Sequence, residues 1–161
     1  EVLNRENTLV NSSRVNLEAG IGKSDAYFFK NVNGTFTYIL PVSGEHPEAP
    51  EEEKPALIMD LLVKGPEDER LFSEIPEGIS LLESSIDNRL VTLDFDDAIL
   101  DYGGNAREKG ILEQILYSMA QVMDTDKVRI MVEGKAATLP EGTDVSKALP
   151  IPAAINDIID Q

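Results

Sequence analysis

The sequence predicts an α+β fold, a two-layer sandwich in which two helices cover one face of a mostly antiparallel sheet. Leu, Ile, Val and Phe make up 47 of the 161 residues, so a buried core can form. Two segments repeat apolar residues at helical spacing, and several shorter segments are typical of strands. Their order along the chain is a β-hairpin followed by α-β-β-α-β, which favours helices packed on one layer.

The charge balance excludes several classes of function. The chain carries 30 acidic residues against 14 Lys and Arg, a formal net charge of −16. A nucleic-acid binder needs clustered Lys and Arg to contact phosphates, and an anionic membrane surface would repel this chain. No apolar run approaches the roughly 18 residues that a membrane-spanning helix requires.

Cysteine is absent from the sequence, and His46 is its one histidine. Disulfides, thiolate nucleophiles and Cys-ligated zinc are therefore excluded, and so is a metal site built from several histidines. A Ser-His-Asp triad would have to use His46. This residue lies in a segment rich in Pro and Glu, so we interpret it as a solvated loop residue.

One domain is expected, flanked by two short tails. Residues 1–24 are polar and have no sustained period, which is typical of an N-terminal tail or linker. The domain is predicted over residues 25–156, and a C-terminal tail over residues 157–161. A short helical or frayed end is expected near residues 155–159.

A β-hairpin opens the predicted domain. Residues 26–30 are aromatic and strand-like, residues 35–40 alternate, and the Asn-Val-Asn-Gly of residues 31–34 joins them. Residues 41–55 contain four prolines and five glutamates, so they are interpreted as a loop that becomes the first turn of a helix. In that turn, Glu51–Glu53 would be solvated side chains at the end of the helix where the dipole favours negative charge.

The first helix is predicted over residues 56–65. Leu57 and Leu61 lie along one side, with Ile58 and Leu62 beside them, which gives an apolar stripe at i and i+4. A Gly-Pro pair follows directly and is a typical helix stop.

Three further strands are predicted. Residues 79–86 and 90–95 are β-rich runs joined by a short turn, and residues 127–133 form the last strand. Alternate apolar residues of the second run share one face, which we expect to lie in the core. They are Val91, Leu93 and Phe95. The opposite sheet face and the sheet edges would be left to solvent or to another chain.

The strongest helix signal covers residues 106–123. Apolar residues recur there at helical spacing and are expected to face the core. They are Ile111, Ile115, Met119 and Val122, with Leu112, Leu116 and Met123 widening the stripe. Asn105 is predicted as the N-cap, and Glu108 three residues later would complete a capping box. Met119 and Met123 are interpreted as core residues rather than as a docking surface.

Four short motifs in this order resemble the GerM domain, the sporulation and germination domain of spore-forming bacteria. The family pattern has a helix ending in Leu-Leu-x-Gly-Pro, an Ile-Pro-x-Gly turn, a strand ending in Val-Asp-Phe-Ser, and a later strand ending in Val-x-Gly. The corresponding residues here are 61–66, 75–78, 91–96 and 128–134. The chain departs from the pattern at Asp96, where the family usually has Ser, and at Ile151-Pro152, where an Arg commonly follows. The resemblance covers roughly residues 26–156.

The resemblance implies a scaffold or assembly role and no enzyme activity. The family fold is similar to the ring-building motif of secretion and sporulation machines, and its members are often extracytoplasmic lipoproteins. We therefore expect a cell-envelope protein, held at the membrane by an anchor outside this chain, with protein partners in an envelope-spanning sporulation complex. Self-association by head-to-tail packing is a further expectation. The family transfers no catalytic, cofactor-binding or metal-binding residue, and nucleic acids and small-molecule substrates are not expected.

The most enzyme-like feature is an acidic cluster that consists of Asp94, Asp96, Asp97 and Asp101. We interpret these residues as solvating a strand end and a turn, because Ile99 stands where a calcium-binding loop needs glycine. Two alternatives stay open: a cation site, and a carboxylate-based hydrolase of cell-wall material that uses two of the four. A non-catalytic module that binds cell wall or peptide is a third alternative.

A glycine pair precedes the second helix. Gly103, Gly104 and Asn105 could present N–H groups to an anion. Acidic residues on both sides make this a poor phosphate site, so a plain helix entry is predicted. The sequence alone thus assigns no catalytic, cofactor or metal residue.

Overall fold

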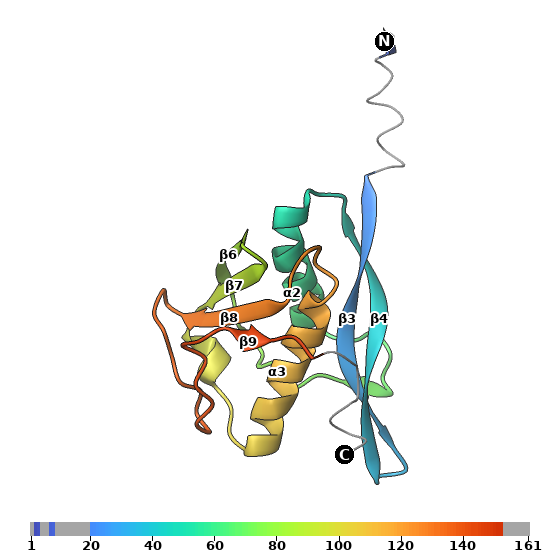
Figure 1. Ribbon diagram of the computed structural model, residues 1–161. Helices are drawn as coiled ribbons and strands as arrows, with labels where there is room; N and C mark the ends of the chain where they lie inside the picture. Colours follow the sequence, from blue (N-terminus) through green and yellow to red (C-terminus); the bar gives the residue numbers. More distant parts are fainter. Residues whose placement is uncertain (1, 4–6, 9–19, 153–161) are drawn as a thin grey trace.

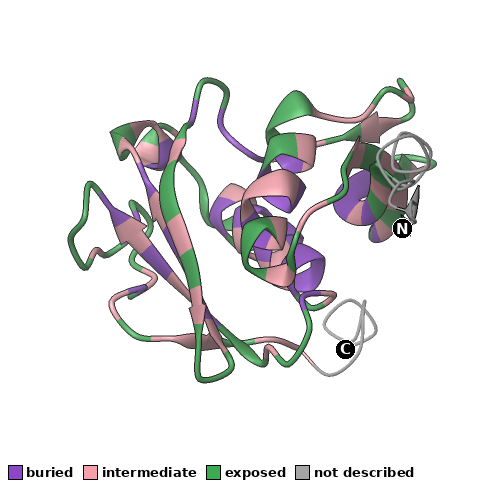
Figure 2. Ribbon diagram, turned by 90° about the horizontal axis from the view of Figure 1, so that it is seen from above, coloured by how far each residue is buried: buried purple, intermediate pink, exposed green. Residues whose placement is uncertain are grey.

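Three layers follow one another across the molecule: a four-stranded sheet, two helices, and a long hairpin (Figure 1). The computed structural model describes residues 2–3, 7–8 and 20–152. The predicted α+β class is confirmed, with both helices on one face of a mostly antiparallel sheet. The hairpin forms a separate sheet on the other side of these helices, as the view from above shows (Figure 2).

The described elements, in chain order, are β1 (Val2–Leu3), β2 (Asn7–Thr8), β3 (Ile21–Val32), β4 (Phe36–Pro47), the 3-10 helix η2 (Glu51–Glu53), α2 (Lys54–Lys64), β5 (Leu71–Phe72), β6 (Leu81–Asp87), β7 (Leu90–Phe95), the 3-10 helix η3 (Asp97–Leu100), α3 (Asn105–Met119), β8 (Lys127–Val132) and β9 (Leu149–Pro150). β1 pairs with β2, and the other sheets have the orders β4-β3-β5 and β6-β7-β8-β9. The end predicted near residues 155–159 and the tail at 157–161 lie outside the described residues.

The two strands of the hairpin are longer than predicted. β3 begins at Ile21, inside the segment interpreted as a tail, and β4 continues to Pro47. The interpretation of residues 41–47 as loop was therefore wrong. The two strands pair antiparallel over their whole length around the predicted Asn-Gly turn.

Proline is tolerated in β4 because β4 lies at the edge of its sheet. The cross-strand partner of Pro41 is Tyr27, whose N–H donates to Ser118 Oγ (3.1 Å) and whose carbonyl accepts from Gln114 Nε2 (2.9 Å). The backbone groups of Tyr27 thus point away from β4, so no N–H is needed from Pro41. A proline-rich composition predicted a loop where the structure has an edge strand.

Side chains of α3 and of the turn that follows it take the place of a neighbouring strand along the other edge of β3. The N–H of Asp25 donates to Gln121 Oε1 (2.9 Å), and Gln121 Nε2 donates to the carbonyl of Asp25 (2.6 Å). Together with Gln114 and Ser118, Gln121 completes a row at helical spacing that bonds the backbone of β3. Gln114 and Ser118 are completely buried. This row joins the hairpin to the helix layer.

α2 is confirmed as a helix that ends before a Gly-Pro pair. Its C-cap, Gly65, has a φ of 86°, a conformation that favours glycine. The most deeply buried side chains are Ile58, Met59 and Leu62, whereas Leu57 is only half-buried. The predicted stripe was therefore displaced by about one residue, because α2 packs against both sheets rather than against one.

β7 supplies the centre of the main sheet. Val91, Leu93 and Phe95 are completely buried, as their alternation predicted. β6 pairs with β7 antiparallel, whereas β8 pairs with β7 in parallel, and α3 makes the crossover between them. The two-residue strands β5 and β9 escaped prediction because they are too short to show a period.

α3 is shorter at its C-terminal end than predicted. It ends at Met119, which is buried in the core, and Met123 lies beyond it with 64% of its surface exposed. The interpretation of Met123 as a core residue was therefore wrong. The predicted capping box is also absent: Gly104 is the N-cap, Asn105 is exposed, and Glu108 faces the interior.

The row of α3 side chains leads to a prediction about stability. In Gln114→Met the side chain keeps its approximate volume but leaves the Tyr27 carbonyl and the Glu74 N–H (2.7 Å from Gln114 Oε1) without partners. We expect the free energy of unfolding to fall by about 2–4 kcal/mol, as for two buried polar groups left unsatisfied. Denaturant unfolding measures it.

Lys109→Met, at an exposed position of the same helix, is the matched control and should change the free energy of unfolding by about 0.5 kcal/mol or less. Equal midpoints for the two variants would show that these hydrogen bonds do not hold the hairpin.

Candidate functional site

Two of the four acidic residues singled out in the sequence bond the backbone of separate turns. Asp94 Oδ1 accepts a hydrogen bond from the N–H of Gly134 (2.9 Å), and Asp96 Oδ1 accepts one from the N–H of Ser80 (3.0 Å). Asp97 donates its own N–H to Glu133 Oε2 (3.1 Å). These bonds close the turns around the end of β7, which is the structural role that the sequence predicted.

Asp94 and Asp96 thus have backbone partners in two separate turns. Within the part of the chain that the structure describes, no three His, Asp or Glu side chains lie close enough to hold a metal ion. Neither of the two hollows described below is lined by Asp94, Asp96, Asp97 or Asp101. The hydrolase alternative thus gains no support from the arrangement of these carboxylates.

His46 lies in β4 rather than in a solvated loop, and it is half-buried. Its Nδ1 is 2.8 Å from the carbonyl of Pro47, which can only accept, so Nδ1 carries a proton. Nε2 lies 2.7 Å from Ser24 Oγ, and in the neutral ring it accepts from that hydroxyl. Ser24 is only 5% exposed, and a carbonyl stands where a catalytic triad has a carboxylate. The pair therefore pins β3 to β4.

The N-terminus of α3 already holds an anion from the chain itself. The N–H of Gly104 donates to Glu141 Oε2 (2.9 Å), a carboxylate from the loop that follows β8. This contact satisfies a donor that the glycine pair could have offered to a phosphate. The glycine pair thus begins a helix, as the sequence predicted, and a carboxylate from a distant loop bonds its N-terminus.

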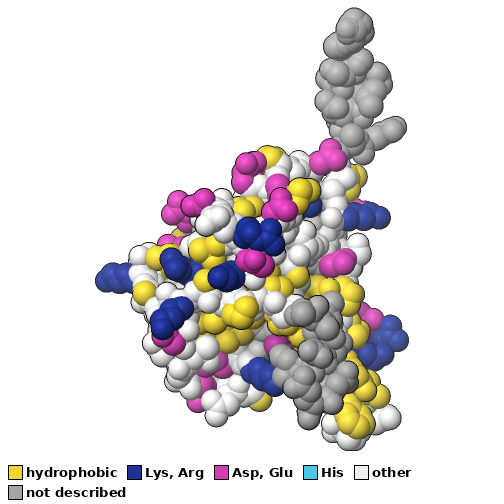
Figure 3. Space-filling model, viewed as in Figure 1, with side chains coloured by type: hydrophobic (Ala, Val, Ile, Leu, Met, Phe, Trp, Pro, Cys, Tyr) yellow, Lys and Arg dark blue, Asp and Glu magenta, His cyan; other side chains and the backbone are white. Residues whose placement is uncertain are grey.

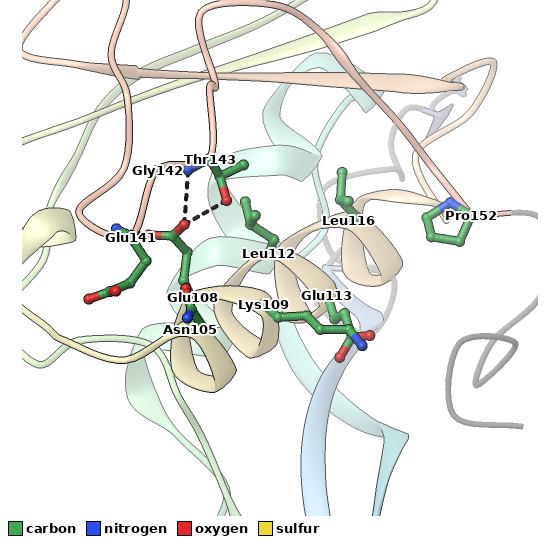
Figure 4. A pocket seen from close by; sticks show the side chains of 10 residues that line it. All are labelled: Asn105, Glu108, Lys109, Leu112, Glu113, Leu116, Glu141, Gly142, Thr143 and Pro152. Atoms are coloured by element: carbon green, nitrogen blue, oxygen red, sulfur yellow. Dashed lines mark hydrogen bonds between the residues drawn. The ribbon is translucent and has the colours of Figure 1, made fainter. Parts of the chain in front are cut away.

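Glu108 is the most heavily bonded carboxylate described. It is 3% exposed and accepts four hydrogen bonds. The donors are the Tyr102 hydroxyl (2.7 Å), the Glu141 N–H (2.8 Å), the Thr143 N–H (3.1 Å) and the Thr143 hydroxyl (2.6 Å). Figure 4 shows it reaching from α3 towards Gly142 and Thr143. Glu108 therefore fastens the loop after β8 to the helix.

The surroundings of Glu108 keep it ionised. Burial alone would raise the pKa of this carboxyl, but the hydrogen bonds from Thr143, Glu141 and Tyr102 outweigh burial and lower it. Burial and the bond to Glu108 raise the pKa of the Tyr102 hydroxyl. These hydrogen bonds make Glu108 a structural centre that holds the loop after β8.

Beside Glu108, an open trough of about 470 Å³ runs between α3 and the loop that leads to Pro152 (Figure 4). Leu112, Leu116 and Pro152 give it an apolar side, and Lys109 and Glu113 stand at its rim. Burial raises the pKa of Glu113, and Lys109 partly offsets that rise. The trough is open to solvent and wide enough to receive a side chain.

A larger hollow of about 690 Å³ lies between the hairpin and the end of α2. Ala26, Phe28, Val42 and Leu61 form its apolar part, and charged residues of β4 and of the loop after α2 surround it. Gly44 sets how closely the two walls approach, because a Cβ there would come within 2.7 Å of a Leu61 methyl carbon. This hollow was not foreseen, since its two walls are 20 residues apart in sequence.

The acidic run before α2 is partly engaged. Glu51 Oε2 accepts from the N–H of Met123 (2.6 Å), and Glu51 Oε1 is 3.3 Å from Lys54 Nζ. Glu51 thus ties the start of α2 to the end of α3, in place of the purely solvated role predicted for it. Glu52 and Glu53 are exposed, as predicted.

The functionally relevant residues that sequence reasoning missed are buried polar side chains of α3. The position of Glu108 three residues after Asn105 suggested a capping box. In the structure Glu108 instead bonds Glu141 and Thr143 of the loop after β8. Gln114 and Ser118 interrupt no apolar period, and their partners lie some 90 residues away in the sequence. No local pattern could have found them.

The chain matches the model of a known protein family. A family model named Germane, described as sporulation and spore germination, matches residues 25–138. No curated protein matches the chain. Among the residues that the structure describes, no helix has the length and apolar character needed to cross a bilayer.

Solved structures share the fold. The tandem GerMN domains of the sporulation protein GerM from Bacillus subtilis match with a TM-score of 0.71 at 20% identity, over 85% of this chain and 48% of that one. The first GerMN domain of the same protein matches at 0.58 and 16%, over 83% and 96%. A candidate lipoprotein from Clostridium perfringens matches at 0.57 and 18%, over 82% and 89%. This chain thus spans about half of the tandem structure.

Removing the charge of Glu108 should destabilise the fold. In Glu108→Gln an amide NH₂ replaces one carboxylate oxygen, so it confronts donors from Glu141 or Thr143 instead of accepting from them. We expect a loss of about 2–3 kcal/mol in the free energy of unfolding at neutral pH. Glu52→Gln removes the same charge at an exposed position and should have little effect. If the two variants unfold at the same denaturant concentration, Glu108 does not fasten the loop.

Acid should reduce the difference between wild type and Glu108→Gln. The pKa of Glu108 in the folded protein lies below its ordinary value of 4.5, so the ionised group stabilises the fold above that value. This contribution is lost as the pH falls through the folded pKa, where the wild-type carboxyl also becomes neutral. Unfolding at a series of pH values from 7 downward should show the two curves converging in acid. Parallel curves would mean that the pKa of Glu108 is not lowered by folding.

Proposed function

Because the chain belongs to the Germane family of sporulation and spore germination, we propose that it is a non-enzymatic assembly module. It acts outside the cytoplasmic membrane, in a complex that serves sporulation or germination. The match over residues 25–138 carries this proposal, because it covers the helices, most of the hairpin and most of the main sheet.

The chemistry of the site supports a role in binding rather than in catalysis. The buried carboxylate of Glu108 is committed to its own loop, and Asp94 and Asp96 each bond the backbone of a separate turn. His46 holds two strands together. What the described residues offer to other molecules is therefore surface: two open hollows and a set of exposed apolar side chains.

The proposed location is the outer side of the cytoplasmic membrane, with an anchor that lies outside this chain. A candidate lipoprotein from Clostridium perfringens shares the fold over 89% of its length. A lipid-anchored domain needs no membrane-spanning helix of its own. The probe for this proposal is fractionation of the native cell, in which the full-length protein should follow the membrane and be accessible to added protease.

The proposed partners are proteins of an envelope-spanning sporulation complex, together with further copies of this domain. In the Bacillus subtilis protein, two GerMN domains occur in tandem within one chain. A three-layer domain whose layers are joined by buried hydrogen bonds is a rigid unit, and rigid units assemble without a large loss of conformational entropy.

Single substitutions in the acidic cluster should leave the biological activity intact. In a native strain deleted for the gene, the wild-type gene and variants with Asp94→Asn, Asp96→Asn, Asp97→Asn or Asp101→Asn should restore heat-resistant spores and germination equally. Asn keeps an oxygen that accepts the turn hydrogen bonds of Asp94 and Asp96, so the fold is preserved.

The hydrolase alternative makes the opposite prediction, since replacing an essential carboxylate commonly lowers the rate by orders of magnitude. A variant that unfolds at the same denaturant concentration as wild type, yet fails to restore spores, would count against the non-enzymatic proposal. A deletion strain with normal spore yield and normal germination would count against the sporulation role itself.

A further inference from the structure

The closed end of the hairpin presents two exposed aromatic rings. Phe36 is 56% exposed and Tyr38 is 37% exposed, and their ring centroids are 6.4 Å apart. Hydrophobic side chains gather at this lower end of the hairpin in Figure 3. Aromatic side chains of this size bury about 150–250 Å² each when they enter a pocket. An exposed pair is therefore a candidate anchor for binding another protein.

The same end of the hairpin is unusual in its charge. Residues 30–38, which we call the tip, contain no Asp or Glu and carry one cation, Lys30, in a chain with a net charge of −16. Lys30 is the cross-strand neighbour of Tyr38 and lies on the same face of the hairpin. The tip is therefore a small aromatic and basic surface on an acidic molecule.

The hollow between the hairpin and α2 has the complementary character. Ala26 and Phe28 at its apolar floor are each 2% exposed, and the volume of about 690 Å³ suits large side chains. Two of the carboxylates around it have nearby cations, since Asp68 is 2.8 Å from Arg70 and Glu67 is 3.8 Å from Lys64. Glu45 lines the hollow, and none of the described residues forms an ion pair with it.

We infer that the tip of one copy of this chain binds in the hollow of a second copy. Phe36 and Tyr38 would enter the apolar part, and Lys30 would pair with Glu45 of the other copy. Two chains of charge −16 repel each other, so a contact between them is favoured where a surface free of acids meets an uncompensated carboxylate. This inference rests on the proposed assembly role and names the surfaces through which copies would meet.

The contact joins two unlike surfaces of the chain. The tip and the hollow are different patches, so a single contact leaves one tip and one hollow unused. Two copies can exchange tips in a closed dimer, or each can pass its tip to a further copy. In both cases the contact is lost when either patch is altered.

Sedimentation velocity over a range of concentrations tests the inference on the 161-residue chain. The wild type should show a sedimentation coefficient that rises with concentration, and Phe36→Ser with Tyr38→Ser should abolish the rise. Leu82→Ser removes a side chain that is 52% exposed on β6 and should leave it unchanged. All of these positions are on the surface, and circular dichroism would verify that each variant is folded.

A charge exchange then identifies the pair of residues. Lys30→Glu alone and Glu45→Lys alone should each weaken association at least severalfold, and the chain with both substitutions should regain it. Restoration requires the two residues to face each other across the contact. A wild type that stays monomeric at all concentrations overturns the inference. If the wild type associates but the tip variant does so equally, the tip contact is wrong while self-association through another surface stands.

Discussion

The structure depends on one constraint: α3 lies between two sheets, so the polar side chains that it carries inward must find partners within the protein. A buried polar group without a partner costs up to a few kcal/mol, which is a large part of the stability of a domain of this size. Gln114 and Ser118 meet the constraint on the hairpin side by bonding the backbone of β3, and Gln121, just beyond the end of α3, extends the row. Glu108 meets it at the N-terminal end by gathering donors from the loop after β8.

The same constraint explains why the acidic and hydroxyl groups that contact each other in the described part of the chain serve the fold. Catalytic groups are kept short of partners so that they can act on a substrate. Glu108 and His46 instead have their bonding positions filled by the chain itself. These polar groups hold two strands, a helix and a loop together.

Much of the fold followed from local patterns. The alternation of Val91, Leu93 and Phe95 and the helical spacing of Ile111 and Ile115 reflect which face each element buries, and the structure places these residues in the core. Composition gave a wrong prediction for residues 41–47, because proline, although typical of loops, is also tolerated in a strand at the edge of a sheet. Pro41 was assigned to a loop because proline is common in loops. In the structure its cross-strand partner, Tyr27, directs its backbone N–H to Ser118, so the sheet needs no N–H from Pro41.

The sequence by itself determined the fold class, the two amphipathic helices, the central strands and the family resemblance, because each is encoded in neighbouring residues with a fixed period or motif. Only the tertiary structure decided that the hairpin forms its own layer, that Glu108 is an internal hydrogen-bonding centre rather than a cap, and that a hollow lies between β4 and α2. These features join residues that are distant along the chain, such as Tyr27 with Gln114. A local period reports which face of an element is apolar, but it contains no information about which distant partner covers that face.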